Sequence, residues 1–173
     1  MVNRDPMLNE SICSYAAMRR ATRRMGQIFD DALTPCGLKT TQMGLLSQIQ
    51  RLGSPTLKVL ADAIVMDLSA LGHTLKPLER DGFVEIRKDP QDGRAKRVGL
   101  TEAGQRKLQE AAKLWRTVHD RCEDVLEPDK ARELRRTLDW IASIEFAQQF
   151  GSVLESSADK GPGRYPPRMS PSR

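Results

Sequence analysis

The sequence of 173 residues has no long apolar run, few aromatic residues and only two histidines. None of its apolar stretches approaches the roughly 20 residues that a transmembrane helix needs. Residues 1–6 lack the apolar segment of a secretory signal, so we expect neither membrane insertion nor export. Three widely spaced cysteines cannot form a disulfide scaffold and are typical of reduced thiols in a cytoplasmic protein.

Features of an enzyme are also missing. The histidines, His73 and His119, fall in different predicted helices without metal-ligand spacing, and no glycine-rich phosphate loop is present. The sequence therefore gives little support for catalysis, and we expect no metal or cofactor. What it does contain is charge: 29% of residues are charged, the net charge is +5 and the isoelectric point is about 9.3. This balance favours a polyanionic partner, although only weakly by itself.

The middle of the chain has the pattern of three helices. Thr40 or Thr41 can cap a helix that ends at Gly53, and a short helix is expected over 54–64. After a turn at residues 65–66, Asp67 occupies an N-cap position before a helix that extends to Arg80. Its buried stripe would be Leu71, Leu75 and Leu78, and Pro77 should bend its last turn. Two short helices joined by a tight turn are typical of a helix–turn–helix.

A basic hairpin follows directly. Residues 83–87 and 97–100 alternate apolar and polar side chains, and the segment between them contains the turn sequence Asp-Pro-Gln-Asp-Gly. Lys88, Lys96 and Arg97 beside this turn are expected to contact phosphate, which adds affinity without sequence preference. A helix–turn–helix followed by a positively charged hairpin predicts binding to duplex DNA.

Longer helices are expected on both sides of this core. Residues 12–33 place Cys13, Ala17, Ala21, Met25 and Ile28 on one side at helical spacing. Thr101 can cap a long helix, and Pro128 can begin a sixth helix that extends to Phe146. A second copy of the chain is the simplest partner that could bury their apolar faces. From Ser156 the composition becomes rich in Pro, Gly and Ser, so residues 156–173 are expected to be a flexible tail.

These motifs resemble the MarR family of winged helix–turn–helix transcriptional regulators. The resemblance lies in Leu60-Ala61-Asp62, Met66-Asp67, Leu78-Glu79-Arg80-Asp81-Gly82-Phe83-Val84, Asp89-Pro90, Asp92-Gly93-Arg94, Arg97 and Leu100-Thr101-Glu102-Ala103-Gly104. It implies a mainly α fold with a small β-hairpin wing, in which a domain at 8–150 has a winged helix–turn–helix core at about 41–104. It further implies dimerisation helices at about 8–33 and 102–150. The expected function is that of a cytoplasmic homodimeric regulator, a repressor, that binds a pseudo-palindromic operator in double-stranded DNA.

The resemblance also implies roles for individual residues. Arg94 would reach the minor groove or its phosphates, while Asp92 would hold the wing and orient that arginine. The recognition helix would present side chains to base edges or backbone, with one lysine near phosphate: Ser69, Ala70, His73, Thr74 and Lys76. Many relatives carry an arginine directly after the cap aspartate, where this chain has Leu68. Few long donors remain on this helix, so specificity would depend more on the wing and on DNA shape.

A small effector, aromatic or anionic, is expected between the dimer helices and the winged domain. The residues that could line its site are Cys13, Ala17, Arg20, Met43, Leu46 and Trp115. The apolar members could equally belong to the core. The basic cluster at Arg19, Arg20, Arg23 and Arg24 has three interpretations: a solvated surface, salt bridges between subunits, or an anchor for an anionic effector.

Two alternatives remain from the sequence. Cys13 resembles the reactive cysteine of the hydroperoxide-sensing branch of the family, which would make the protein a redox-responsive regulator. In that branch tyrosine hydroxyls support the thiolate, but Phe29 at a corresponding position has no hydroxyl, which favours an inert buried thiol. The other alternative is a helical dimer that binds proteins and has lost its affinity for DNA.

Overall fold

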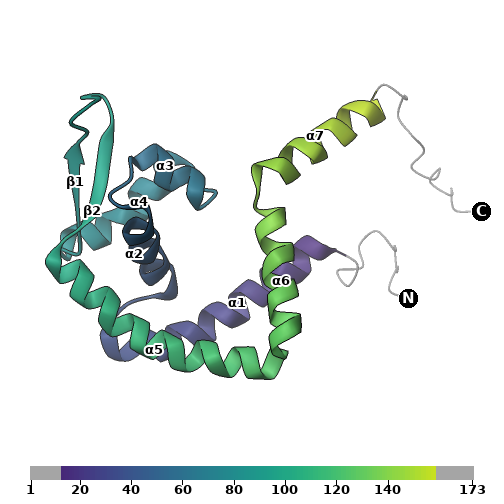
Figure 1. The fold of residues 1–173 in the computed structure, drawn as a ribbon, viewed down its shortest axis with the longest axis horizontal. Helices are drawn as coiled ribbons and strands as arrows, with labels where there is room; N and C mark the ends of the chain where they lie inside the picture. Colours follow the sequence, from purple (N-terminus) through teal and green to yellow (C-terminus); the bar gives the residue numbers. More distant parts are fainter. Residues whose placement is uncertain (1–12, 159–173) are drawn as a thin grey trace, which may run out of the picture. The chain divides into compact units, whose positions relative to one another are not determined.

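The computed structural model describes residues 13–158, with side chains described up to residue 153. Its elements follow the chain in this order (Figure 1): α1 (Ser14–Leu33), the 3₁₀ turn η2 (Thr34–Cys36), α2 (Thr40–Leu52), α3 (Leu57–Ala63), α4 (Leu68–Arg80), β1 (Val84–Lys88), β2 (Lys96–Leu100), α5 (Glu102–Leu126), α6 (Pro128–Ile141) and α7 (Ile144–Ala158). Within the described range, the strands form one two-stranded antiparallel sheet. The predicted fold class, mainly helical with a small β-hairpin, is confirmed.

The chain divides into two compact units, whose boundary lies within α5 between Cys122 and Glu123. The first unit contains α1 to α4, the hairpin and most of α5; the second contains the end of α5 with α6 and α7. The predicted segments 8–12 and 159–173 lie outside the described residues, while α7 occupies residues 156–158. None of the helices over 13–158 is both long and apolar enough to cross a membrane.

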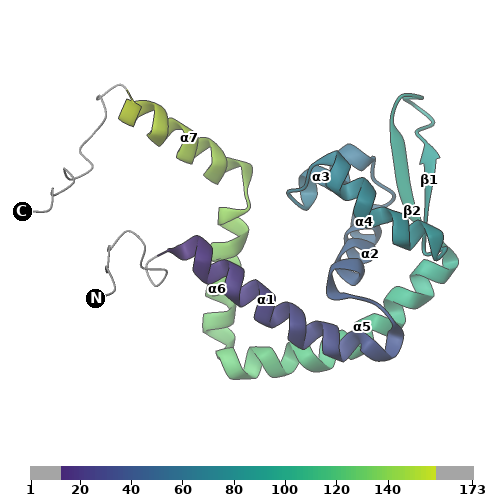
Figure 2. The same cartoon turned by 180° about the vertical axis from the view of Figure 1, so that it is seen from behind.

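The core of the first unit lies where α2, α3, α4 and the hairpin meet (Figure 2). Its fully buried side chains come from every one of these elements and from the end of α1: Leu33, Leu46, Ile49, Leu60, Leu71, Leu75, Leu78 and Val98. Burying a leucine contributes roughly 1.5–3 kcal/mol. The predicted stripe of α4 is therefore confirmed, and it fixes which face of that helix remains outside.

The hairpin is joined to α5 by a capped turn. The Thr101 hydroxyl oxygen accepts the Gly104 N–H at 3.0 Å and its O–H donates to the Gly82 carbonyl at 2.6 Å. A Cβ at Gly104 would stand 1.9 Å from the Phe83 carbonyl oxygen, so only glycine fits here. The Leu-Thr-x-x-Gly motif therefore specifies the packing of the first turn of α5 against the start of the wing.

The start of α2 differs from the prediction. Thr40 is the first helical residue rather than the cap, and the cap is Lys39, whose N–H donates to Oε1 of Gln42 at 2.9 Å. The Thr40 N–H donates to Oδ1 of Asp30 in α1 at 2.7 Å. This hydrogen bond lowers the pKa of Asp30. Asp30, near the end of α1, thus helps to cap α2 although it lies ten positions earlier in the sequence.

The predicted sixth helix is two helices in the structure. Instead of one helix that extends to Phe146, α6 ends at Ile141 and α7 begins at Ile144. Ser143 separates them because its hydroxyl oxygen accepts the Phe146 N–H at 3.1 Å, as an N-cap residue does. The Trp140 and Phe146 rings, 4.7 Å apart and edge to face, pack across the junction.

The predicted apolar stripe of α1 is not buried in the single chain. Phe29 and Leu33 are the buried residues of this helix, whereas Ile28 is 39% exposed. Cys13, at the N-cap, is exposed, so the prediction that this thiol is buried is wrong for the single chain. The reason is that only the C-terminal end of α1 packs against the core of the first unit.

Candidate nucleic-acid interface

The turn between α3 and α4 is held by backbone geometry and a helix cap. Val65 adopts a left-handed conformation with φ of 53°, and the Met66 N–H donates to the Ala61 carbonyl at 2.9 Å. The Asp67 side chain then accepts the Ala70 N–H at 2.7 Å, which confirms it as the cap of α4. The first turn of α4 is thereby fixed in direction.

The face of α4 opposite its buried stripe carries most of the predicted contact residues. Ser69, His73 and Lys76 are exposed, while Ala70 and Thr74 are half-buried. The Thr74 hydroxyl donates to the Ala70 carbonyl at 3.0 Å, so its proton is already used. This face offers few long donors, in keeping with the sequence.

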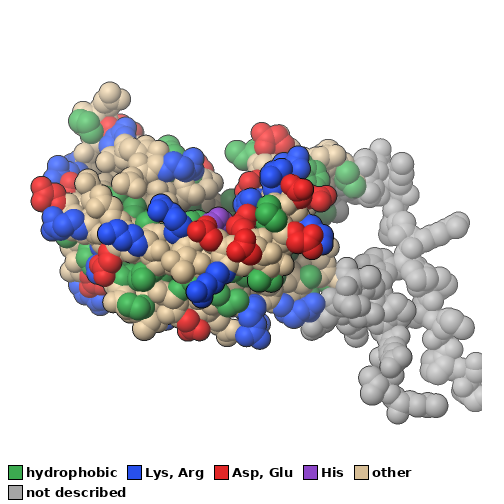
Figure 3. Space-filling model, turned by 60° about the horizontal axis from the view of Figure 1, so that its bottom comes forward, with side chains coloured by type: hydrophobic (Ala, Val, Ile, Leu, Met, Phe, Trp, Pro, Cys, Tyr) green, Lys and Arg blue, Asp and Glu red, His purple; other side chains and the backbone are tan. Residues whose placement is uncertain are grey.

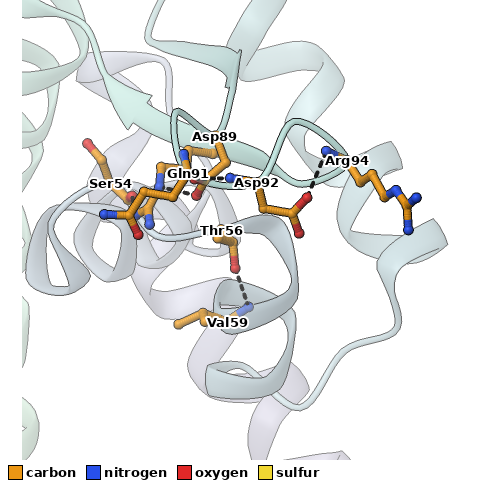
Figure 4. Close-up of polar contacts among 8 residues, drawn as sticks. Ser54, Thr56, Val59, Asp89, Gln91, Asp92 and Arg94 are labelled. Carbon is orange, nitrogen blue, oxygen red and sulfur yellow. Dashed lines mark hydrogen bonds and ion pairs between the residues drawn. The ribbon is translucent and has the colours of Figure 1, made fainter.

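The wing presents its basic residues at the far end of the hairpin. The strand register runs from Val84 opposite Leu100 to Lys88 opposite Lys96, so the two lysines form the last pair before the turn. Both lysines are exposed, as is Arg94. The Arg94 N–H donates to Oδ1 of Asp92 at 3.0 Å. Figure 4 shows the Arg94 guanidinium pointing away from the other labelled side chains.

Asp89 closes the turn from the inside, a role that the sequence analysis did not assign to it. Its Oδ1 accepts the N–H groups of Gln91 at 2.7 Å and Asp92 at 3.1 Å (Figure 4). Its Oδ2 accepts Nε–H of Arg97 at 2.5 Å, and Nη1 of Arg97 also donates to the Ser54 carbonyl at 2.9 Å. The hydrogen bonds to the carboxylate, first that from the Gln91 N–H, then those from the Asp92 N–H and Arg97, lower the pKa of Asp89. The available sequence signal was the Asp-Pro pair that opens the turn.

A cavity of about 410 Å³ lies between α2 and α5 in the first unit. Its wall combines apolar, polar and basic side chains: Thr40, Met43, Gly44, Ser47, Gln48, Gln50, Leu108, Ala112, Trp115 and Arg116. Two of the predicted effector residues, Met43 and Trp115, are on this wall. Leu46 is instead fully buried in the core. Ala17 and Arg20 are exposed on α1 and Cys13 is exposed at its N-cap; all three lie outside the cavity wall.

Charge is not gathered into one patch on the face drawn in Figure 3, where basic and acidic side chains are interspersed with apolar ones. The net positive charge of the chain alone therefore does not locate a DNA-binding surface. The position of Arg94 and the two lysines at the end of the wing is the more specific signal.

Comparison with known proteins decides the family. A model of the MarR family matches residues 38–96, which span α2 to the start of β2. The structure of the M. tuberculosis transcriptional regulator MOSR in complex with DNA is 32% identical, with a TM-score of 0.70 over 78% of this chain and 97% of that chain. The chain is a member of the MarR family.

Other solved structures share the fold. The transcriptional repressor CouR, bound to a 23-mer DNA duplex, is 26% identical with a TM-score of 0.70 over 78% of this chain and 96% of that chain. CouR from Rhodococcus jostii RHA1 bound to p-coumaroyl-CoA gives 21% identity and a TM-score of 0.66, over 78% of this chain and 94% of that chain. Family and fold together identify this MarR-family protein as a DNA-binding transcriptional regulator.

Proposed function

We propose that this MarR-family regulator is a cytoplasmic repressor that binds a pseudo-palindromic operator as a homodimer and is released by a small effector. One observation carries the DNA-binding mode: α4 is buried along Leu71, Leu75 and Leu78, and its opposite face is open directly behind the Asp67 cap. The N-terminal part of such a helix contacts base edges in the major groove. In a two-fold dimer, the half-sites would be about 10–10.5 bp apart.

The contact residues divide by chemistry. Ser69, Ala70, His73 and Thr74 would face base edges or the adjacent backbone, where short side chains offer few bidentate hydrogen bonds. Lys76, Lys88 and Lys96 would neutralise phosphates, which supplies affinity and salt dependence. Arg94, exposed at the wing tip, would enter the minor groove or bind its phosphates, with its backbone held by Asp92.

Substitutions at the wing test this mode. Arg94→Ala should weaken operator binding by about 1–3 kcal/mol, whereas Lys96→Ala should weaken all DNA about equally and flatten the salt slope by roughly one. Fluorescence-anisotropy titrations over a salt series, on operator and on random duplex, separate the two effects. Lys113→Ala, which removes an exposed charge on α5, is the matched control. Unchanged operator affinity in the Arg94→Ala variant would refute the wing contact.

Homodimerisation is supported by apolar side chains that the single chain leaves exposed on its outer helices. They include Tyr15, Ile28, Leu134, Leu138, Ile144, Phe150 and Val153. Ala131 is the single buried residue within α6. Helices with so little burial need a partner to be stable in water. A second copy would also supply the second recognition helix that a palindromic operator requires.

The effector would bind in the cavity between α2 and α5. Trp115 offers an aromatic surface, and the Arg116 guanidinium and polar side chains such as Ser47 offer hydrogen bonds. Such a wall suits an aromatic carboxylate. The CouR structure with p-coumaroyl-CoA provides a precedent for ligand binding in this fold.

A redox response through Cys13 is a second candidate, because this thiol is exposed at the N-cap of α1. Cumene hydroperoxide should then abolish operator binding by the wild type, and the Cys13→Ser variant should resist the treatment. If the oxidised wild type binds its operator as before, this candidate is excluded.

A further inference from the structure

Asp89 is the one charged residue that is buried among residues 13–153, with a side chain only 4% exposed. A buried carboxylate is costly unless it is hydrogen-bonded and paired with a cation. Here Oδ1 accepts two backbone N–H groups of the turn and Oδ2 accepts the Arg97 guanidinium. The turn is therefore organised around a charged carboxylate that is almost completely screened from solvent.

Arg97 extends this arrangement to the helix–turn–helix. Its guanidinium joins Asp89 to the carbonyl of Ser54, a residue in the loop that leads from α2 into α3. Backbone contacts lie beside it: the Val98 N–H donates to the Pro55 carbonyl at 3.0 Å, and Thr56 and Arg97 form a β-bridge. The planar guanidinium reaches both acceptors at once, which a lysine ammonium would do less well.

A chain of hydrogen bonds leads from Asp89 to the wing tip. Oδ1 of Asp89 accepts a hydrogen bond from the Asp92 N–H, and Oδ1 of Asp92 accepts one from the Arg94 N–H (Figure 4). We infer that Asp89 and Arg97 are positioning residues for DNA recognition, which fix Arg94 relative to α3 and α4 through Ser54. Arg97 has this role in place of the phosphate contact expected from its charge. The inference rests on the proposed contact of Arg94 with DNA.

The direction in which one substitution changes the affinity for DNA separates a positioning role from an electrostatic one. Asp89→Asn removes a negative charge from a hairpin that would approach phosphates, so Coulomb's law alone predicts tighter binding to all DNA. Loss of the ion pair with Arg97 releases the turn and predicts weaker operator binding. Glu85→Gln is the matched control, because it removes the same charge from the same hairpin, where Glu85 pairs with Arg87 in an exposed ion pair.

The Arg97→Lys substitution is a second test, which separates a positioning role of Arg97 from a phosphate contact. A phosphate contact would survive this change because the charge is kept. A bridge between Asp89 and Ser54 would be lost because it depends on the planar fork of donors. This variant also tests the inference if Asp89→Asn does not fold.

The experiment is an operator titration at fixed salt of the wild type, Asp89→Asn, Arg97→Lys, Arg94→Ala, the Asp89→Asn/Arg94→Ala double variant and Glu85→Gln. Asp89→Asn and Arg97→Lys should each bind the operator at least about fivefold more weakly, and Glu85→Gln should bind as well as the wild type or better. The double variant should be within about twofold of Arg94→Ala alone, because Asp89 acts through Arg94. A general loss of stability would instead weaken both backgrounds equally.

Two results overturn the inference: operator binding by Asp89→Asn or Arg97→Lys as tight as that of the wild type, or full additivity in the double variant. In either case a loss of affinity in Arg94→Ala leaves the proposed function standing. If Arg94→Ala itself binds normally, the proposed wing contact fails first, and the inference fails with it.

Discussion

Leu68 is the residue at which this chain departs most clearly from the pattern that the family resemblance implies. It is the first residue of α4, directly after the Asp67 cap, and it is 53% exposed. An apolar side chain at the start of a recognition helix cannot donate a hydrogen bond, but it can contact the C5-methyl group of thymine. We therefore expect this position to read a thymine in each half-site.

Replacement of that thymine by uracil tests the expectation, because only a methyl group is removed. Operator affinity should fall by about 0.8 kcal/mol, or about fourfold, in the wild type. In the Leu68→Ala variant the same replacement should have no effect. Binding of both duplexes is measured by titration at fixed salt, and a loss of equal size in the two proteins would contradict the contact.

A second prediction at the residue scale concerns acid. The pKa of Asp89 lies below the ordinary 3.8, first because its carboxylate accepts the Gln91 N–H. A lowered folded-state pKa gives stability that is fully present above the unfolded pKa and is lost as pH falls through the folded value. The urea midpoint of the wild type should therefore fall between about pH 5 and pH 2 more steeply than that of Asp89→Asn. The urea midpoint of Asp30→Asn, measured over the same pH range, provides the comparison, because the pKa of the Asp30 carboxyl group is also lowered.

At the scale of elements, what the sequence predicted well was local. The Asp67 and Thr101 caps, the α4 stripe and the hairpin depend on side chains within a few residues of each other. The cap that Asp30 gives to α2 spans ten positions in the sequence, and the Arg97–Ser54 bond spans 43. Neither has a local signature, so the structure was needed to find the positioning pair. Of the six residues predicted to line an effector site, Met43 and Trp115 are on the cavity wall. Helical spacing cannot tell a buried residue that also faces a cavity, such as Met43, from one enclosed in the core, such as Leu46.

Helix α6 gives a prediction at this scale. Leu134, Leu138 and Ile141 follow one another at i, i+4 and i+7, and Leu138 is 40% exposed. Leu138→Glu should place a charge in the proposed dimer interface and shift the protein to monomer. Its affinity for the operator should then fall to its affinity for random duplex. Sedimentation velocity and titration are the two measurements. Arg136→Glu introduces the same side chain at an exposed position two residues away and should remain dimeric. A dimeric Leu138→Glu protein would argue against α6 as the interface.

At the scale of the whole molecule, the cavity and the DNA-binding face must be linked if an effector is to act as a switch. A ligand shifts the regulator away from its DNA-competent state only by as much as its affinity differs between the two states. The linkage is reciprocal, so operator DNA must lower ligand affinity by the same factor as the ligand lowers DNA affinity.

The corresponding prediction uses aromatic carboxylates as probes, for example benzoate, salicylate and p-coumarate. At least one should raise the melting temperature of the free protein and weaken operator binding by a factor of roughly 5–150. Trp115→Ala, which removes the aromatic wall, should abolish both effects, whereas Thr117→Ala, exposed on the same helix outside the cavity wall, should retain them. Calorimetric titration of the ligand with and without operator then gives the reciprocal factor. A ligand that stabilises the wild type and Trp115→Ala equally binds elsewhere, and the cavity would then have no part in the switch.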